Sequence, residues 1–280
     1  LVIGLGKGEN FIASDIPAII NHTRDTYILN DGEVAVVTKD SVRVSDLEGN
    51  LINKKVYHVT WNAEAAEKGG FEHFMLKEIY EQPKAIRDTL TGRISKDNKE
   101  VVFEELGWEP ADVASVNRIL ITACGTAYHA GLVAKYYIEQ LARIPVEVDI
   151  ASEYRYRDPL TDKNTLAIVI SQSGETSDTL AALKEAKRRG ARSLAVTNVV
   201  GSSIAREANQ VIYTWAGPEI AVASTKAYTT QLVALLLLAV YIGKLNGKLD
   251  AALAEKILTD LHELPNLCNE IFETVDDIKA

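Results

Sequence analysis

The sequence predicts an α/β protein in which a doubly wound parallel sheet follows a smaller antiparallel β segment. From about residue 117 onwards, continuous apolar runs of strand type alternate with segments of helical periodicity. Strands that are apolar on both faces belong to a parallel sheet that helices cover on both sides, and right-handed crossovers make such a sheet doubly wound. Residues 1–60 differ, because their apolar residues alternate with polar ones between short turn signals, which is typical of antiparallel strands.

The first 60 residues contain three stretches that predict strands and turns. In TYILNDGEVAVV (26–37) the alternation surrounds Asn30-Asp31-Gly32, which predicts a hairpin, and SVRVSDLEGN (41–50) repeats the strand-then-turn pattern. GLGKG (4–8) imitates a dinucleotide-binding fingerprint, but no amphipathic helix follows it, so a turn between two strands is favoured. These strands are too few to bury a core alone. We therefore expect residues 1–60 to be the end of a larger β-containing domain.

The next segment changes to a helical pattern. FEHFMLKEIYEQP (71–83) has apolar residues at helical spacing, and Pro83 interrupts the pattern. AIRDTLTGRI (85–94) continues as a second helical piece. We assign residues 61–110 to a helical joint. The apolar face predicted for its first helix comprises Phe71, Phe74, Met75 and Ile79.

Residues 111–247 are expected to form the parallel sheet and its covering helices. Each apolar run is followed by a helical segment, and the last helix, from about residue 226, is apolar on all sides. Residues 248–280 are helical as well. The expected strands are NRILITA (117–123), VEVDI (146–150), LAIVIS (166–171), RSLAVTN (192–198) and QVIYT (210–214).

Charge and composition exclude several classes of function. A formal net charge of −9 and a pI near 5.2 argue against nucleic acid as the main partner, because phosphate backbones attract basic surfaces. The two cysteines, Cys124 and Cys268, and the five histidines lack the spacing of a metal site. Two thiols in a chain of this length indicate a reducing compartment, so we expect a cytoplasmic protein. LVALLLLAVYIG (232–243) is too short for a membrane span and predicts a buried helix of the core or of a dimer interface.

Small polar residues gather at three strand ends of the predicted sheet. In doubly wound sheets, ligands bind beyond the carboxyl ends of the strands. A helix N-terminus there has free backbone N–H groups and a positive dipole end of roughly half a charge, so it binds anions without a cationic side chain. Hydroxyl groups add donors, and Gly174 lets the backbone approach a ligand closely. The three clusters are Cys124-Gly125-Thr126, residues Ser171 to Thr176, and Ser224-Thr225-Lys226.

Each cluster also has a plainer interpretation. Serine and threonine commonly cap helices, but one cap needs one hydroxyl and residues 171–177 offer four, so a phosphate-binding loop is favoured there. Lys226 either approaches the anionic ligand or is a solvated lysine in the first turn of a helix, where it opposes the dipole. Cys124 is a candidate nucleophile, but no histidine is reliably placed beside it. A buried small apolar residue is therefore the favoured interpretation of Cys124.

Three motifs carry a resemblance to a known family. ACGTAYHAG (123–131), SQSGETSDTLAAL (171–183) and VASTKAYTTQL (222–232) resemble the sugar-phosphate-binding half of the glutamine–fructose-6-phosphate aminotransferases (isomerising), the glucosamine-6-phosphate synthases. More broadly, they resemble the sugar isomerase, or SIS, domain. GFEHFMLKEIYEQP (70–83) resembles the segment that joins the glutaminase and isomerase domains of that family, and GKGENFIASDIPAI (6–19) resembles the end of its glutaminase domain.

The resemblance implies a domain plan and roles for individual residues. Residues 1–60 would be the C-terminal part of a glutaminase domain, residues 111–247 a first SIS domain of flavodoxin-like fold, and residues 248–280 the helical start of a second SIS domain. Many members have serine where this chain has Ala127, so one hydroxyl contact would be replaced by backbone or water. The implied binders of phosphate and sugar are Thr126, Ser171, Gln172, Ser173, Thr176, Val222 and Ser224, with Cys124, Gly125 and Lys226 as further candidates.

The resemblance also implies substrate binding without turnover by this chain. The family transfers the amide nitrogen of glutamine to fructose 6-phosphate and isomerises the product to glucosamine 6-phosphate, without an organic cofactor. Its glutaminase needs an N-terminal cysteine, whereas this chain begins with Leu1, and its isomerase residues belong to a second SIS domain and a C-terminal tail. We therefore expect a fragment without catalytic residues that binds fructose 6-phosphate or glucosamine 6-phosphate, forms a homodimer, and contacts neither nucleic acid nor membrane. The alternatives are a regulatory SIS module that senses a phosphosugar and a sugar-phosphate isomerase with a single SIS domain.

Overall fold

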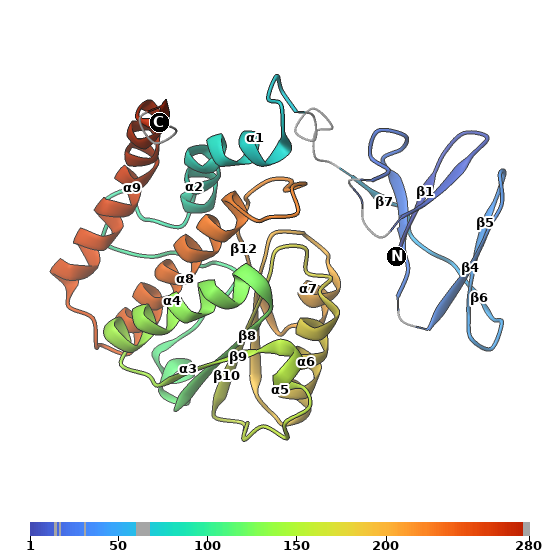
Figure 1. The fold of residues 1–280 in the computed structure, drawn as a ribbon. Coiled ribbons are helices and arrows are strands. Elements are labelled where there is room, and N and C mark those ends of the chain that lie inside the picture. Colours follow the sequence, from blue (N-terminus) through green and yellow to red (C-terminus); the bar gives the residue numbers. More distant parts are fainter. Residues whose placement is uncertain (14–15, 17, 31, 60–67, 277–280) are drawn as a thin grey trace. The chain divides into compact units, whose positions relative to one another are not determined.

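The computed structural model describes residues 1–13, 16, 18–30, 32–59 and 68–276 (Figure 1). The chain divides into two compact units, Leu1–Phe74 and Met75–Ala280. The first unit is built from antiparallel strands and the second is α/β. The predicted fold class, a doubly wound parallel sheet preceded by an antiparallel β segment, is therefore confirmed.

The N-terminal unit contains two antiparallel sheets. A four-stranded sheet has the order β2-β1-β3-β7, and a three-stranded sheet has the order β4-β5-β6. The predicted turn at residues 4–8 joins two paired strands, as expected. The strands are β1 (Val2–Leu5), β2 (Asn10–Ala13), β3 (Asp25–Ile28), β4 (Glu33–Val37), β5 (Val42–Asp46), β6 (Leu51–Ile52) and β7 (Tyr57–His58).

The predicted hairpin over residues 26–37 is wrong. Strand β3 pairs with β1 and β7, whereas β4 pairs with β5 in the other sheet. The carboxylate of Glu33 accepts hydrogen bonds from the backbone N of Asn30 (2.8 Å) and from its Nδ2 (3.0 Å). These bonds form a local turn that carries the chain from one sheet to the next. Asp31, the middle residue of the predicted turn, lies outside the described residues.

The second unit is built on a five-stranded parallel sheet with the order β12-β11-β10-β8-β9. All five predicted strands are present. The chain passes from β8 to its neighbour β9 on one side, and then returns to the other side of β8 to form β10. The sheet therefore reverses its winding direction between β8 and β10. The strands are β8 (Arg118–Ala123), β9 (Val146–Ile150), β10 (Thr165–Ser171), β11 (Arg192–Thr197) and β12 (Gln210–Tyr213).

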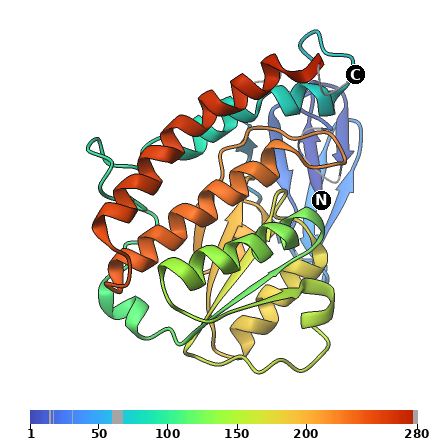
Figure 2. The same cartoon turned by 60° about the vertical axis from the view of Figure 1, so that its left-hand side comes forward.

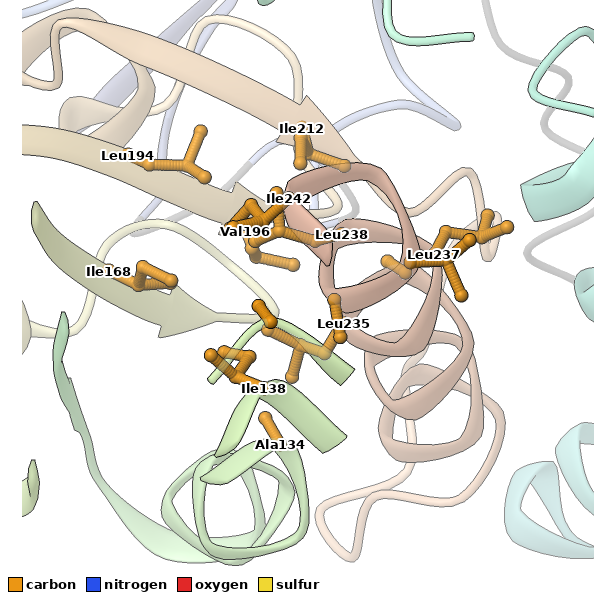
Figure 3. Close-up of a cluster of buried hydrophobic side chains, with 14 of the residues drawn as sticks. Ala134, Ile138, Ile168, Leu194, Val196, Ile212, Leu235, Leu237, Leu238 and Ile242 are labelled. Atoms are coloured by element: carbon orange, nitrogen blue, oxygen red, sulfur yellow. The ribbon is translucent and has the colours of Figure 1, made fainter. Parts of the chain in front are cut away.

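Helices cover both faces of this sheet (Figures 1 and 2). Helices α4 (Gly125–Leu141) and α8 (Lys226–Leu245) share one core with side chains such as Ile168 and Val196 from the strands. Figure 3 shows side chains of both helices meeting those of the strands there. The opposite face, which includes Ala167 and Val169, packs against three helices. These are α5 (Ala151–Tyr154), α6 (Ser177–Arg188) and α7 (Ser203–Glu207).

Helix α8 is the apolar helix that the sequence predicts. Its length of 20 residues and mean hydropathy of 1.5 would suit a membrane span, and among the described residues it is the one helix that meets this test. However, residues such as Leu235 and Leu238 are fully buried in the core of the second unit, which accounts for the composition. Helices α2 (Gln82–Leu90) and α9 (Ala251–Glu273) pack around α8, and α3 (Pro110–Ala114) precedes the sheet.

The apolar face predicted for the first helix of the joint is only partly correct. Helix α1 (Phe74–Tyr80) leaves Met75 43% exposed, whereas its charged residues Lys77 and Glu78 are buried. Pro83 lies in the first turn of α2, where its missing N–H is tolerated. The two charged residues are buried because each has a polar partner in the second unit, as described below for the site.

The C-terminal turn of α6 contains a carboxylate whose pKa is strongly lowered. Glu185 Oε1 accepts hydrogen bonds from Arg188 Nη2 (2.7 Å) and Arg189 Nε (2.6 Å). The bond from Arg188 is the main cause that lowers the pKa of Glu185 from 4.5 to about 2. A carboxylate with a lowered pKa in the folded state stabilises the fold at pH values above 4.5, and this contribution is lost as the pH falls through about 2.

We therefore expect Glu185→Gln to lower the melting temperature at neutral pH and to have a smaller effect in acid. The difference from the wild-type chain should shrink between about pH 5 and about pH 2, as the native carboxylate becomes protonated. Thermal unfolding, followed by circular dichroism at several pH values, measures this difference in melting temperature. Glu255→Gln, on α9, is the control for loss of an exposed charge. A difference that stays constant across this range would contradict the prediction.

Candidate functional site

The predicted polar clusters lie at the carboxyl edge of the parallel sheet, where its winding reverses. In the register, Ala123 at the end of β8 lies beside Ile170 of β10, and Ser171 lies beside Thr197 of β11. The loops that follow β8 and β10 therefore leave the sheet from adjacent strands, toward helices on opposite faces. Such a reversal point opens a crevice between the two loops and is the usual ligand position in doubly wound sheets.

The loop that follows β10, residues 171–176 (the serine loop), has an internal hydrogen-bond network. Ser171 is 3% exposed, and its Oγ accepts a hydrogen bond from Gly174 N (3.0 Å) and lies 2.9 Å from Thr176 Oγ1, with which it shares another. Ser173 Oγ accepts from Glu175 N at 3.2 Å. The hydroxyl of Ser171 thus shapes the loop, while Gln172, Ser173 and Thr176 are half-buried at its surface.

The serine loop leads directly into α6, whose first turn has no side-chain cap. Thr176 occupies the N-cap position with extended backbone, yet its side chain makes no capping hydrogen bond. The interpretation of these hydroxyls as helix caps is therefore wrong. Backbone N–H groups at an uncapped helix start, together with the positive dipole end, favour an anion. Because the loop contains no lysine or arginine, its amides and hydroxyls are the donors that it offers.

The serine loop is seated against the start of α7. Gly174 has a φ of +65°, and a Cβ on it would lie 2.0 Å from Ser202 Oγ and 2.5 Å from Ser202 Cβ. Its carbonyl accepts a hydrogen bond from Ile204 N (2.9 Å), and Glu175 Oε1 accepts one from Ser203 N (2.7 Å). Glycine is required at this position both for the backbone conformation and for the close approach.

The loop that follows β8 is more open. Gly125, with a φ of +59°, and Thr126 are exposed, and the hydroxyl of Thr126 makes no hydrogen bond with the described residues. Cys124, which was expected to be buried, is only half-buried against the core beneath α5 and α6, and it is a free thiol. Ala127 is 8% exposed and packs in the core beneath α4 and α8. Thr126 is thus the side-chain donor that this loop presents to solvent.

The loop between β12 and α8, residues 214–225, is organised by carboxylates. Ser224 Oγ donates to Glu219 Oε2 (3.0 Å), while Glu219 Oε1 accepts from Thr225 N (2.9 Å) and Ala227 N (3.1 Å). This carboxylate satisfies two N–H groups at the start of α8, those of Thr225 and Ala227, a role that the sequence did not suggest for Glu219. Val222 is fully exposed at the tip of the loop.

Lys226 belongs to a buried charged cluster. It is 3% exposed, and its Nζ lies 2.6 Å from Glu81 Oε2, so its interpretation as a solvated lysine is wrong. Glu81 Oε1 also lies 3.5 Å from Lys77 Nζ. A second carboxylate of this cluster, Glu78, accepts hydrogen bonds from the backbone of the loop between β12 and α8. The pairing of Lys77 with Glu81 at i and i+4 is the one signal in the sequence that points to this cluster.

The site as a whole contains donors suited to an anionic, hydroxylated ligand. Hydroxyls and amides of the serine loop lie beside the exposed Thr126, while the nearby carboxylates are occupied within the protein. Among the residues that the structure describes, no group of three His, Cys, Asp or Glu side chains is arranged to hold a metal ion. The arrangement favours binding through hydrogen bonds and a helix start over binding through a cationic side chain.

Comparisons with known proteins agree with this geometry. The model of the SIS domain family matches residues 112–241. The chain is 59% identical over 279 residues to glutamine–fructose-6-phosphate aminotransferase (isomerizing) of Clostridium tetani, and 56% identical to the protein of the same name from Caldanaerobacter subterraneus. Each alignment covers 100% of this chain and 46% of the relative, so the chain spans about half the length of these curated relatives.

A solved structure gives a matching fold. The C-terminal domain of glucosamine-fructose-6-phosphate aminotransferase from Francisella tularensis superposes with a TM-score of 0.71 and 40% sequence identity. The alignment covers 76% of this chain and 59% of that structure. About three quarters of this chain therefore shares its fold with a protein related in sequence.

Proposed function

Residues 112–241 form an SIS domain within a chain related along its whole length to part of the glutamine–fructose-6-phosphate aminotransferases, and from this premise we propose that the chain binds fructose 6-phosphate. The phosphate lies at the serine loop and the start of α6, and the open-chain sugar extends between the other two loops. The observation that carries this proposal is the uncapped start of α6 behind a loop whose hydroxyls do not cap it.

The proposed contacts divide among the three loops. Ser173 and Thr176 donate hydroxyl hydrogen bonds to the phosphate, supported by backbone N–H groups of the serine loop. Ser171 keeps the loop in shape through its bonds to Gly174 and Thr176. The remaining proposed contacts to phosphate or sugar come from Gln172, Thr126, Val222 and Ser224, with Cys124 and Gly125 beside Thr126.

Lys226 is not assigned to the ligand in this proposal. Its ammonium group is buried and paired with Glu81 at 2.6 Å. Moving that charge to a phosphate would leave Glu81 without this partner, which is costly for a buried pair. The phosphate is therefore held without a lysine, which agrees with the composition of the serine loop.

The proposed reaction belongs to the longer protein. There, the amide nitrogen of glutamine is transferred to fructose 6-phosphate, which is isomerised to glucosamine 6-phosphate, and the present chain contributes the sugar-phosphate site. We assign residues 1–60 to a glutaminase domain, 61–110 to a helical joint, 111–247 to the first SIS domain and 248–280 to the start of a second one. A cytoplasmic homodimer is part of the same proposal, and this chain alone is expected to bind its ligand without turning it over.

We expect Ser173→Ala and Thr176→Ala each to weaken binding of fructose 6-phosphate by about 1–2 kcal/mol, the scale of a hydrogen bond to a charged group. Calorimetric titration of the purified chain measures the change. Inorganic phosphate should bind more weakly than the phosphosugar and lose affinity in the same variants. Fructose without phosphate should not bind.

Ser115→Ala is the matched control for this titration. Ser115 follows α3 near the amino end of β8, at the opposite edge of the sheet, and its hydroxyl makes one local bond to Asp112 O. Ser115→Ala should leave the affinity for fructose 6-phosphate unchanged. If both loop variants also bind as tightly as the wild-type chain, the serine loop does not hold the phosphate.

A further inference from the structure

The loop between β12 and α8 is held in place by a residue that lies outside the SIS domain. Glu78 is on α1, well before residue 112, where the match to the SIS family begins. Its Oε1 accepts hydrogen bonds from Ile220 N (2.6 Å) and Ala221 N (3.1 Å). We infer that Glu78 is a positioning residue that fixes residues 220–225, and through them the sugar end of the site; the second part of this inference rests on the proposed function.

Glu78 is almost completely buried, so its hydrogen bonds must compensate for the lost hydration of its carboxylate. The residue is 2% exposed, and its second oxygen, Oε2, is buried without a hydrogen-bond partner among the described residues. A carboxylate in such a position is costly unless its hydrogen bonds compensate for the lost hydration. Within the part of the chain that the structure describes, the hydrogen bonds of this carboxylate all go to the loop. An apolar residue at this position would remove the desolvation cost but could not hold the loop.

Helix α1 is itself fixed, so that it can act as a support. The ion pair of Lys226 with Glu81 joins the start of α2 to the start of α8, and Lys77 of α1 lies 3.5 Å from the same carboxylate. One turn further along α8, Thr229 Oγ1 donates to Gln82 Oε1 at 2.6 Å. These contacts place the carboxylate of Glu78 at a defined point beside the loop.

Two carboxylates therefore clamp the loop on either side of its tip. Glu78 binds the backbone at residues 220 and 221, and Glu219 binds Ser224 and the backbone of Thr225. Between these anchors, Val222 and the following alanine are exposed. The loop thus presents a tip of two residues toward solvent while both of its ends are held. Removal of the Glu78 anchor frees the first half of the loop and leaves the Glu219 anchor intact.

The test compares Glu78→Met with Glu78→Gln in the full chain. Methionine keeps much of the volume and removes the acceptor, whereas the glutamine amide oxygen can still accept both N–H groups. In calorimetric titration, Glu78→Met should weaken fructose 6-phosphate binding at least tenfold and leave inorganic phosphate binding unchanged, because phosphate contacts the serine loop. Glu78→Gln should bind the phosphosugar within about threefold of the wild-type chain, a difference of less than ~1 kcal/mol.

Thr89→Val is the matched control for loss of stability. Thr89 is fully buried on α2, and its Oγ1 donates to Ala85 O and to Thr214 O, so its loss loosens the joint at the first residue of the loop and leaves the bonds of residues 220 and 221 to Glu78 in place. Thr89→Val should retain the affinity for fructose 6-phosphate although its melting temperature falls by about as much as that of Glu78→Met. Equal losses of affinity in Thr89→Val and Glu78→Met, or phosphosugar binding by Glu78→Met within twofold of wild type, would overturn the inference.

Hydrogen exchange separates this inference from the proposed function. In Glu78→Met the amides of residues 220–223 should exchange faster than in the wild-type chain, while the amide of Thr225, which Glu219 holds, and those of the serine loop keep their rates. This readout needs no ligand. If the wild-type chain does not bind fructose 6-phosphate, the proposed function fails, and the exchange rates still decide whether Glu78 positions the loop. Unchanged exchange over residues 220–223 in Glu78→Met would overturn the positioning role itself.

Discussion

Gly174→Ala is expected to abolish measurable binding of fructose 6-phosphate and to destabilise the second unit by about 3 kcal/mol or more. The backbone of Gly174 has a φ of +65°, which costs any L-residue roughly 1–2 kcal/mol. In addition, the new methyl group would lie 2.0 Å from Ser202 Oγ, so the serine loop and the start of α7 must separate. Overpacking of this kind costs typically about 1–3 kcal/mol. Calorimetry measures the first effect and urea denaturation the second.

Gly247→Ala separates the cost of the backbone conformation from the cost of the contact with Ser202. Gly247 follows α8 and has a φ of +67°, but a Cβ there would meet no atom within 4 Å. It should show the backbone cost alone, about 1–2 kcal/mol, with unchanged ligand affinity. If Gly174→Ala were no more destabilising than Gly247→Ala and still bound the phosphosugar, the contact with Ser202 would not define the loop.

Glu81→Ala is expected to cost about 3 kcal/mol of stability, the lower end of the range for breaking a buried ion pair. Lys226 would remain 3% exposed with its charge no longer paired with Glu81. The side chain of Glu81 is 28% exposed to solvent. Water can therefore enter the space that it leaves, which limits the loss of stability. Urea denaturation of the full chain, followed by circular dichroism, measures the change in the free energy of unfolding.

Two further variants test that the cost comes from the unpaired lysine. The double variant Glu81→Gln with Lys226→Met removes both charges and should recover much of the stability, because neither charge of the pair is then left without its partner. Asp88→Ala breaks the exposed i,i+4 pair with Lys84 on the same helix, α2, and should cost less than about 1 kcal/mol. A loss below about 1 kcal/mol in Glu81→Ala would mean that Lys226 does not depend on this partner.

The parallel sheet could be predicted because its signals are local. A run such as LAIVIS (166–171) is apolar on both faces, and only a strand covered on both sides accounts for that. The pairing of the antiparallel strands β3 and β4, in contrast, was predicted wrongly from the sequence. The turn signal at residues 30–32 is present, but β3 and β4 each have a better partner elsewhere in the chain. Pairing between distant strands depends on contacts that a local pattern does not contain.

The candidate site also has one part that the sequence predicted and one part that it did not. The serine loop was predictable, because its hydroxyls follow a buried strand and precede a helix. The partners of the loop that precedes α8 were not, since Glu78 lies more than a hundred residues before that loop in the chain. Periodicity placed the apolar residues of α1 inward, whereas the structure buries Lys77 and Glu78 and exposes Met75. A charged residue is buried when its partners surround it, and those partners are known only once the chain is folded.

The distance along the chain between Glu78 and its loop has a consequence for biosynthesis. A ribosome adds residues from the N-terminus, and domains generally fold as they emerge. Glu78 is made long before Ile220 and Ala221, the residues whose backbone it binds. Until they appear, its carboxylate must stay hydrated, and the helix that carries it has no buried place to occupy. The joint therefore settles late, after the last strand of the sheet has been made, and the loop that precedes α8 is completed at the same moment as the joint.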